Sequence, residues 1–252
     1  MSEGHESSQD EGSARVEYGQ IDKQLVGELL GILAHDLRNP LSALNSNLGY
    51  LGSVLAGADP DAGEAIDDGV VSCDGLSHII DNVDLFGQLL RGEVKVRSAA
   101  VPLQSIVGAA VQSCQSAARS HGLTINAIEA TERRHLMVQA SRDLATRSLA
   151  NLIRNSIQHA PTGSTVAVTM HEGSSGASSV RVTDEGAALG ESSLSAFTAV
   201  GQLHAKANLH SRYSRGLGLF SAQLAARFCN AVVAAQPQAS GNCFELRFLG
   251  LP

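Results

Sequence analysis

Six leucines recur between residues 37 and 55 at intervals that alternate between four and three, and this repeat constrains the fold more than any other feature of the sequence. They are Leu37, Leu41, Leu44, Leu48, Leu51 and Leu55. This spacing places apolar side chains in one continuous stripe along an α-helix. We therefore expect a long helix from about Ile21, with a stripe that another helix must cover.

A second helical stripe follows a predicted turn at Gly57–Gly63, which contains Asp59-Pro60-Asp61. Its apolar members are Ile66, Val70, Cys73, Leu76, Ile80, Val83 and Leu90. Two helices joined by a turn predict an antiparallel hairpin. Half of each stripe would stay in water unless two hairpins pair by two-fold symmetry into a four-helix bundle, so we expect a homodimer. The alternative is that the hairpin packs on the C-terminal half of its own chain.

The chain divides into three parts by composition. Residues 1–18 are rich in Ser, Glu, Gly and Asp and nearly free of apolar side chains, which predicts a disordered tail. Residues 19–92 form the expected dimerisation hairpin. Residues 98–252 form a second domain, which follows a short extended piece at Glu93–Arg97.

Helices and strands alternate in the second domain. We expect helices at 102–119, 141–159 and 217–228, and strands at 123–128, 136–138, 165–170, 180–183, 232–236 and 244–248. Because aromatic residues make up only 4% of the chain, Leu, Val, Ile and Ala must build the core. The predicted fold class is α+β: a long helical hairpin followed by an α/β sandwich with helices on one face of a mixed sheet.

Charge and composition exclude several functional classes. The net charge of −7 argues against nucleic-acid binding. No apolar run approaches the roughly 20 residues of a membrane-spanning helix, so we expect no membrane insertion. Cys73, Cys114, Cys229 and Cys243 lie in apolar stretches without metal-type spacing, which predicts buried free thiols and a reducing, cytoplasmic location.

The stretch His35-Asp36-Leu37-Arg38-Asn39-Pro40-Leu41 carries the first chemical signal. Pro40 cannot donate a backbone hydrogen bond to Asp36, so a bend or loosening is expected one turn from His35. His35 falls beside the leucine stripe, where its ring reaches solvent. A surface histidine next to a kink would look the same from this segment alone.

Three later stretches add polar and glycine residues in order. Asn151 and Asn155 lie four apart on one face of a predicted helix that ends at His159. Asp184-Glu185-Gly186 leaves a predicted strand, and Gly216-Leu217-Gly218 opens a predicted helix, whose N-terminus can hold phosphate oxygens. Each stretch alone also has a purely structural explanation. The asparagines would then be solvated, Asp184-Glu185-Gly186 would be an ordinary turn, and the glycines would simply begin a helix.

Together, these four stretches resemble the H-box, N-box and two glycine boxes of two-component sensor histidine kinases, over residues 21–250. The resemblance implies an ATP-binding second domain, with Asn155 as the Mg²⁺ ligand and Asn151 and His159 beside it in the N-box. It also implies adenine recognition by Asp184 and Gly186, and phosphate binding by Gly216, Leu217 and Gly218.

The resemblance further implies that His35 accepts the γ-phosphoryl group of ATP, with Asp36 as its acid-base partner. The group would then pass to an aspartate of a response regulator receiver domain. Asn39 matches the position that orients a water for dephosphorylating that regulator. No sensor segment is recognisable, so we expect a separate sensor or upstream signalling protein.

Several positions depart from the family pattern: Ala188 and Ser214 replace glycines, and Gln158 replaces a basic residue. Lys206, Arg212 or Arg215, in the predicted lid 187–215 with Phe197, could supply the missing charge. The departures leave two other classes open. One is a histidine phosphotransfer protein with a degenerate nucleotide domain, and the other is a non-catalytic dimeric adaptor.

Overall fold

The computed structural model of the chain describes residues 23–55, 60–94, 96–128, 136–173, 177–187, 218–238 and 240–250. Four predicted features lie outside these residues: the tail 1–18, nearly all of the lid 187–215, and the glycine-box residues Gly216 and Leu217.

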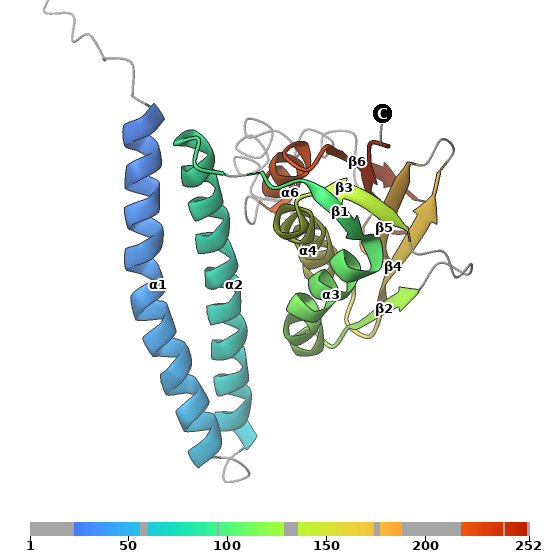
Figure 1. The fold of residues 1–252 in the computed structure, drawn as a ribbon. Coiled ribbons are helices and arrows are strands. Elements are labelled where there is room, and N and C mark those ends of the chain that lie inside the picture. The colour runs from blue at the N-terminus through green and yellow to red at the C-terminus, as the bar shows by residue number, and fades with distance from the viewer. Residues whose placement is uncertain are drawn as a thin grey trace, which may run out of the picture.

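Two long helices run antiparallel at the N-terminal end of the described chain (Figure 1). Helix α1 spans Lys23–Val54 and passes through Pro40 without interruption, and helix α2 spans Pro60–Leu90. The predicted hairpin is confirmed. The predicted turn was too long, because α2 already begins at Pro60; proline suits the first helical position, where its missing N–H costs nothing.

The hairpin has its own small core. Ala34 and Leu41 of α1 pack against Cys73 and Ile80 of α2, with Leu48 and Val83 partly buried beside them. Near the other end the helices approach closely: a Cβ on Gly27 would lie 3.0 Å from the carbonyl oxygen of Gly87. Small residues therefore set the helix spacing there.

The leucine stripe of α1 divides between two faces. Leu41 is buried and Leu48 half-buried inside the hairpin, whereas Leu37, Leu44 and Leu51 are 46%, 48% and 43% exposed. Leu25, Leu29, Ile32 and Leu33 extend the exposed face along α1, and Leu76 and Ile79 of α2 are also exposed. Within one chain, half of the predicted seam is thus uncovered.

The second domain, called the lobe below, contains two sheets. Its elements are β1 (Ala99–Pro102), α3 (Leu103–Ser120), β2 (Thr124–Ile128), β3 (Met137–Ala140), α4 (Arg142–His159), β4 (Thr165–Glu172), β5 (Ser178–Asp184), α6 (Gly218–Arg227), β6 (Ala231–Pro237) and β7 (Asn242–Phe248). The main sheet has the order β2-β4-β5-β7-β6. Among the strands that the structure describes, only β2 and β4 pair in parallel, so the sheet is mixed, as predicted.

One strand was not predicted. Ala99–Pro102 pairs antiparallel with Met137–Ala140 as a separate two-stranded sheet, and the following helix begins at Leu103 and not at Pro102. The residues of β1 are mostly small and show no clear alternation of apolar and polar side chains. They form a strand because they pair with β3.

Helices α3, α4 and α6 cover one face of the main sheet (Figure 1). Phe244, Leu246 and Phe248 of β7 point into this core, where Leu149 and Ile153 of α4 are fully buried. The four cysteines are buried and free, which confirms the prediction for them. No helix in the described ranges is long and apolar enough to cross a membrane.

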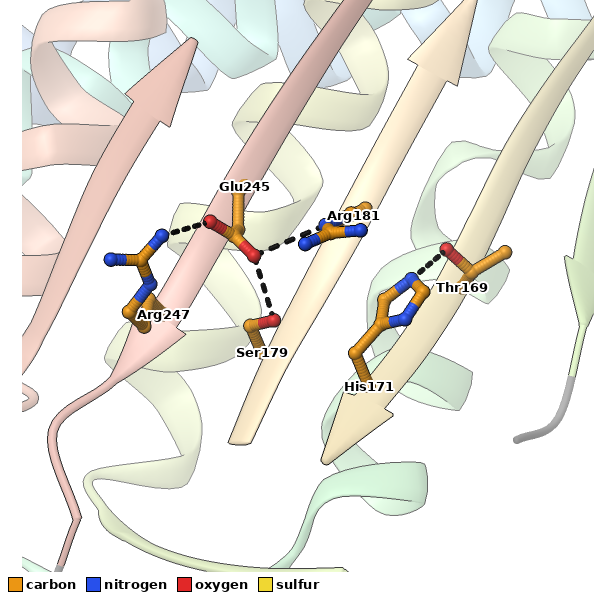
Figure 2. A network of polar contacts seen from close by, with 6 residues as sticks. All are labelled: Thr169, His171, Ser179, Arg181, Glu245 and Arg247. Carbon is orange, nitrogen blue, oxygen red and sulfur yellow. Dashed lines mark hydrogen bonds and ion pairs between the residues drawn. The ribbon is translucent and has the colours of Figure 1, made fainter. Parts of the chain in front are cut away.

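The opposite face of the sheet carries polar side chains (Figure 2). Glu245 accepts hydrogen bonds from Ser179 at 2.9 Å, Arg181 at 3.1 Å and Arg247 at 2.5 Å. Burial raises the pKa of the Glu245 carboxyl, but these hydrogen bonds outweigh burial, so its pKa lies below the ordinary value. The network ties β5 to β7 on the side away from the helices.

Helix α2 also packs on the lobe, on the side opposite α1 (Figure 1). Leu85 is 3% exposed and belongs to the lobe core, with Leu89 packed against it. The rings of Phe86 and Phe220 of α6 meet edge to face with centroids 6.1 Å apart. The hairpin thus packs on its own lobe through α2, as in the predicted alternative to a dimer. This contact leaves the apolar face of α1 exposed.

Candidate functional site

His35 lies on the exposed side of α1. Its buried neighbour Ala34 sets the rotation of the helix, and the side chains of His35 and Asp36 are 73% and 69% exposed. The His35 Nδ1 and Asp36 Oδ1 atoms are 3.2 Å apart. Because an ionised carboxylate can only accept, a neutral His35 carries its hydrogen on Nδ1 and leaves the Nε2 lone pair for solvent.

Arg38 links this segment to α2. Its NH2 atom lies 3.1 Å from Asp81 Oδ1 and 3.6 Å from Asp84 Oδ2. All three side chains are partly exposed, so the pairs add little stability. They fix how α1 sits against α2 one turn from His35. Asn39 is exposed beside them, as the prediction for a water-orienting residue requires.

Asp184 is the most unusual polar residue of the lobe. It ends β5, is 1% exposed, and its Oδ1 accepts hydrogen bonds from the Gly186 amide at 2.9 Å and from Asn242 Nδ2 at 3.1 Å. Its Oδ2 is buried and has no hydrogen-bond partner among the described residues. A buried carboxylate oxygen without a donor is costly, and the amino group of a base would supply that donor.

Gly186 stands where no other residue fits. A Cβ there would lie 2.7 Å from the carbonyl oxygen of His159 and 3.0 Å from Asp184 Oδ1. The end of β5 therefore meets the end of α4, which brings three predicted site residues together. Gly186 therefore lets the backbone after β5 pass close to the last carbonyl groups of α4.

Asn151 and Asn155 share a face of α4, as their spacing predicts. Asn155 is half-buried, and its Nδ2 has no partner in the described part of the chain. Asn151 is 2% exposed and points to the hairpin, where its Nδ2 donates to Asn82 Oδ1 of α2 at 3.3 Å. Among the described residues, Asn151 is thus held by the hairpin through its Nδ2, whereas Asn151 Oδ1 and Asn155 Nδ2 have no hydrogen-bond partner.

A metal at this site would depend on the nucleotide. No group of three or more His, Cys, Asp and Glu side chains in the described ranges could hold an ion alone. Mg²⁺ often keeps one or two protein ligands and completes its shell with phosphate and water. Asn155 would bind such an ion through its Oδ1, and its buried Nδ2, which has no partner among the described residues, would donate to a phosphate oxygen.

The remaining predicted residues are placed in part. Gly218 is the first residue of α6, and α6 packs on α4, where Ser148 Oγ donates to the Ala222 carbonyl at 2.9 Å. Helix α6, which Gly218 begins, is thus packed directly on the helix that carries Asn151 and Asn155. His35, Asp36 and Asn39 are not brought to these residues, since α2 lies between α1 and the lobe (Figure 1).

Sequence reasoning missed three polar residues. Asn242 orients Asp184 from a strand 58 positions away. Asn82 contacts Asn151 from the hairpin, and His78 lies beside Asn82 with 3.4 Å between His78 Nε2 and Asn82 Nδ2. The only signal in the sequence is that these residues interrupt apolar surroundings, which does not identify their partners.

Two protein families match the chain. Residues 25–92 match the His Kinase A (phospho-acceptor) domain. Residues 140–251 match the histidine kinase-, DNA gyrase B- and HSP90-like ATPases. No curated protein matches the chain.

Solved histidine kinases share the fold. Full-length ShkA in complex with AMPPNP superposes with a TM-score of 0.60 at 18% identity, over 90% of this chain and 47% of that one. The chain therefore spans about half the length of ShkA. The histidine kinase AdeS of Acinetobacter baumannii gives 0.53 at 15% identity, over 86% of this chain and 98% of AdeS.

The catalytic domain of histidine kinase ThkA, in a nucleotide-free form, gives a TM-score of 0.51 at 16% identity, over 62% of this chain and 99% of that domain. At these identities the superpositions establish the fold alone. Two family matches in the expected order, over more than half of the residues and on the predicted fold, show that this chain belongs to the histidine kinases.

Proposed function

We propose that the chain takes the γ-phosphoryl group of Mg-ATP onto His35 and passes it to an aspartate on the receiver domain of a response regulator. The observation that carries this proposal is the buried Oδ2 of Asp184, which lacks a donor in the described part of the lobe. An adenine amino group supplies that donor. The exposed His35 supplies the acceptor of the phosphoryl group.

The chemistry at His35 follows from its contact with Asp36. In the proposed reaction, the Nε2 lone pair forms the bond to the γ-phosphorus as the bond from phosphorus to the β,γ-bridging oxygen breaks and ADP leaves. The imidazole becomes positively charged, and the Asp36 carboxylate, 3.2 Å from Nδ1, stabilises that charge. Mg²⁺, held by Asn155, would neutralise part of the phosphate charge.

The second transfer moves the phosphoryl group from Nε2 to a carboxylate of the regulator. Because His35 and Asn39 are both exposed on α1 and one turn apart, a docked receiver domain would reach both. Asn39 could then also orient a water against the phosphorylated aspartate. The proposed activity therefore includes dephosphorylation of the same partner.

The exposed apolar face of α1 supports a homodimer. Leu37, Leu44 and Leu51 form a row at seven-residue spacing, which is the pattern of a helix that pairs with another helix. A second copy would cover this face and complete a four-helix bundle. A separate sensor or upstream protein would act on this assembly.

Incubation of the purified chain with labelled Mg-ATP tests the proposal. We expect a phosphate that is labile in acid and stable in base, and its loss in His35→Gln. His121→Gln is the matched control, because His121 is also an exposed histidine but lies in the lobe. Label that survives His35→Gln would exclude the proposed acceptor.

Two further outcomes distinguish the other classes. A chain that binds no ATP analogue yet accepts phosphate from a phosphorylated receiver domain is a phosphotransfer protein. A chain that does neither is a dimeric adaptor. Either outcome would overturn the proposed kinase activity while leaving the fold unchanged.

A further inference from the structure

A buried polar contact joins the hairpin to the N-box helix. Asn82 of α2 is 7% exposed and Asn151 of α4 is 2% exposed, and Asn151 Nδ2 donates to Asn82 Oδ1 at 3.3 Å. His78, one turn earlier on α2, completes the contact, with its Nε2 3.4 Å from Asn82 Nδ2. Three side chains from two domains thus form one hydrogen-bonded row.

The order of donors and acceptors in this row fixes the state of His78. Since Asn82 Oδ1 accepts from Asn151, the NH2 group of Asn82 faces the His78 ring. An NH2 group can only donate, so the facing ring nitrogen must carry a lone pair. A hydrogen on that nitrogen would place two donors against each other and break the row.

Charges around His78 come from every helix packed near it. They are Arg147 and Arg154 of α4, Asp74 and Asp81 of α2, His121 at the end of α3, and Arg38 of α1, which pairs with Asp81. His78 also lines a cavity of about 50 Å³ between α2 and the lobe, together with Arg154 and Gln158. Arg154 NH2 is held by the Ser113 carbonyl at 3.0 Å, so this cation stays beside the ring.

We propose that His78 and Asn82 are positioning residues that hold Asn151, and with it the nucleotide lobe, against the hairpin only while His78 is uncharged. Acid then releases the lobe from α2 and frees the Asn151 amide. The importance of Asn151 rests on the proposed function. The proton-dependent docking itself requires no nucleotide.

The electrostatics agree with this geometry. Burial first, and the positive charge of Arg154 second, lower the pKa of His78 from 6.5 to about 4, against the opposing effects of Asp81 and Asn151. The undocked state binds the proton more readily, so docking is fully favourable above pH 6.5 and weakens as the pH falls towards 4. Relative to pH 8, the docking constant should fall about fourfold at pH 6 and about thirtyfold at pH 5.

Titration of His78 by NMR in the intact chain tests the proposal, with ring-labelled histidine and the signal assigned through its loss in His78→Gln. The expected midpoint is about 4. Phe86→Ala and Phe220→Ala weaken the docking from opposite sides, so each should raise the midpoint towards 6.5. Val232→Ala, on the exposed side of β6, is the control and should leave it unchanged.

Asn82→Asp keeps the shape of the side chain, and it should change the pKa of His78 without separating the lobe from α2. One carboxylate oxygen would still accept from Asn151, and the other would accept from a protonated His78, so the midpoint should rise. A His78 midpoint near 6.5 in the unmodified chain overturns the proposal, as does a midpoint that none of the three variants moves. Because no nucleotide is present, these results are independent of whether His35 becomes labelled.

Discussion

Asp184→Asn should invert which purine the lobe accepts. Two N–H donors, from Gly186 and Asn242, converge on Asp184 Oδ1. In the variant, the amide oxygen must take this position, because an NH2 group there would face two donors. The NH2 group therefore occupies the place of Oδ2, where the adenine amino group would also bring a donor.

The expected loss follows from one charge-assisted hydrogen bond. Such bonds contribute about 1.5–3 kcal/mol, and Asp184 is only 1% exposed, so water cannot replace the lost acceptor. At about 1.4 kcal/mol for each factor of ten, ADP should bind roughly 10-fold to 100-fold more weakly. Inosine diphosphate, which carries a carbonyl in place of the amino group, should bind the variant better than it binds the original chain.

Calorimetric titration of both nucleotides against both proteins measures this exchange. Glu185→Gln is the matched control, because it removes the same charge from an exposed neighbour and should leave both affinities unchanged. The thermal midpoint of Asp184→Asn should show that the lobe still folds. Equal ADP affinity in the variant and the original chain would refute the proposal that Asp184 binds the adenine amino group.

Three further predictions concern stability and assembly. Gly241→Ala should unfold at a much lower temperature than Gly163→Ala by calorimetry: both glycines have positive φ, but a Cβ at Gly241 would lie 1.7 Å from the Asp184 carbonyl oxygen, whereas Gly163 faces open space. Glu245→Gln should flatten the loss of stability in acid urea titrations, because hydrogen bonds hold the Glu245 pKa low and their contribution is lost as the pH falls through that pKa. Leu44→Asp should shift the sedimentation coefficient from dimer towards monomer, since a charge would enter the apolar face of α1.

The sequence predicts those helices and strands whose apolar side chains recur at a regular spacing. The leucine spacing specifies a helix and its apolar stripe, because the helical period decides which side chains share a face. It could not separate Leu41 from Leu44, although one is buried and the other 48% exposed. That difference depends on the position of α2, which no local pattern records.

Contacts between distant segments were the part that the sequence could not predict. Asp184 was named from its glycine-box motif, but its oriented carboxylate requires Asn242, which only the pairing of β5 with β7 brings near. Ala99–Pro102 becomes a strand for a similar reason, through β3. Which polar residues of different elements pair depends on the folded geometry. The type and neighbours of a single residue in the sequence therefore do not predict its partner.

The position of α2 limits how phosphoryl transfer can occur. His35 lies on α1, on the far side of α2 from the lobe, and α2 holds Asn151 of the N-box (Figure 1). While this contact persists, α2 stands between the lobe and the helix that carries His35, so we expect a nucleotide in the lobe to be kept from His35 of the same chain. Either the lobe leaves α2 first, or it serves His35 of a second copy. In the first case, a substitution of His78 or Asn82 that breaks the row should increase labelling at a pH where the acid-labile phosphate survives. In the second, at an ATP concentration too low to label Asp184→Asn alone, a mixture of His35→Gln and Asp184→Asn chains should regain the label.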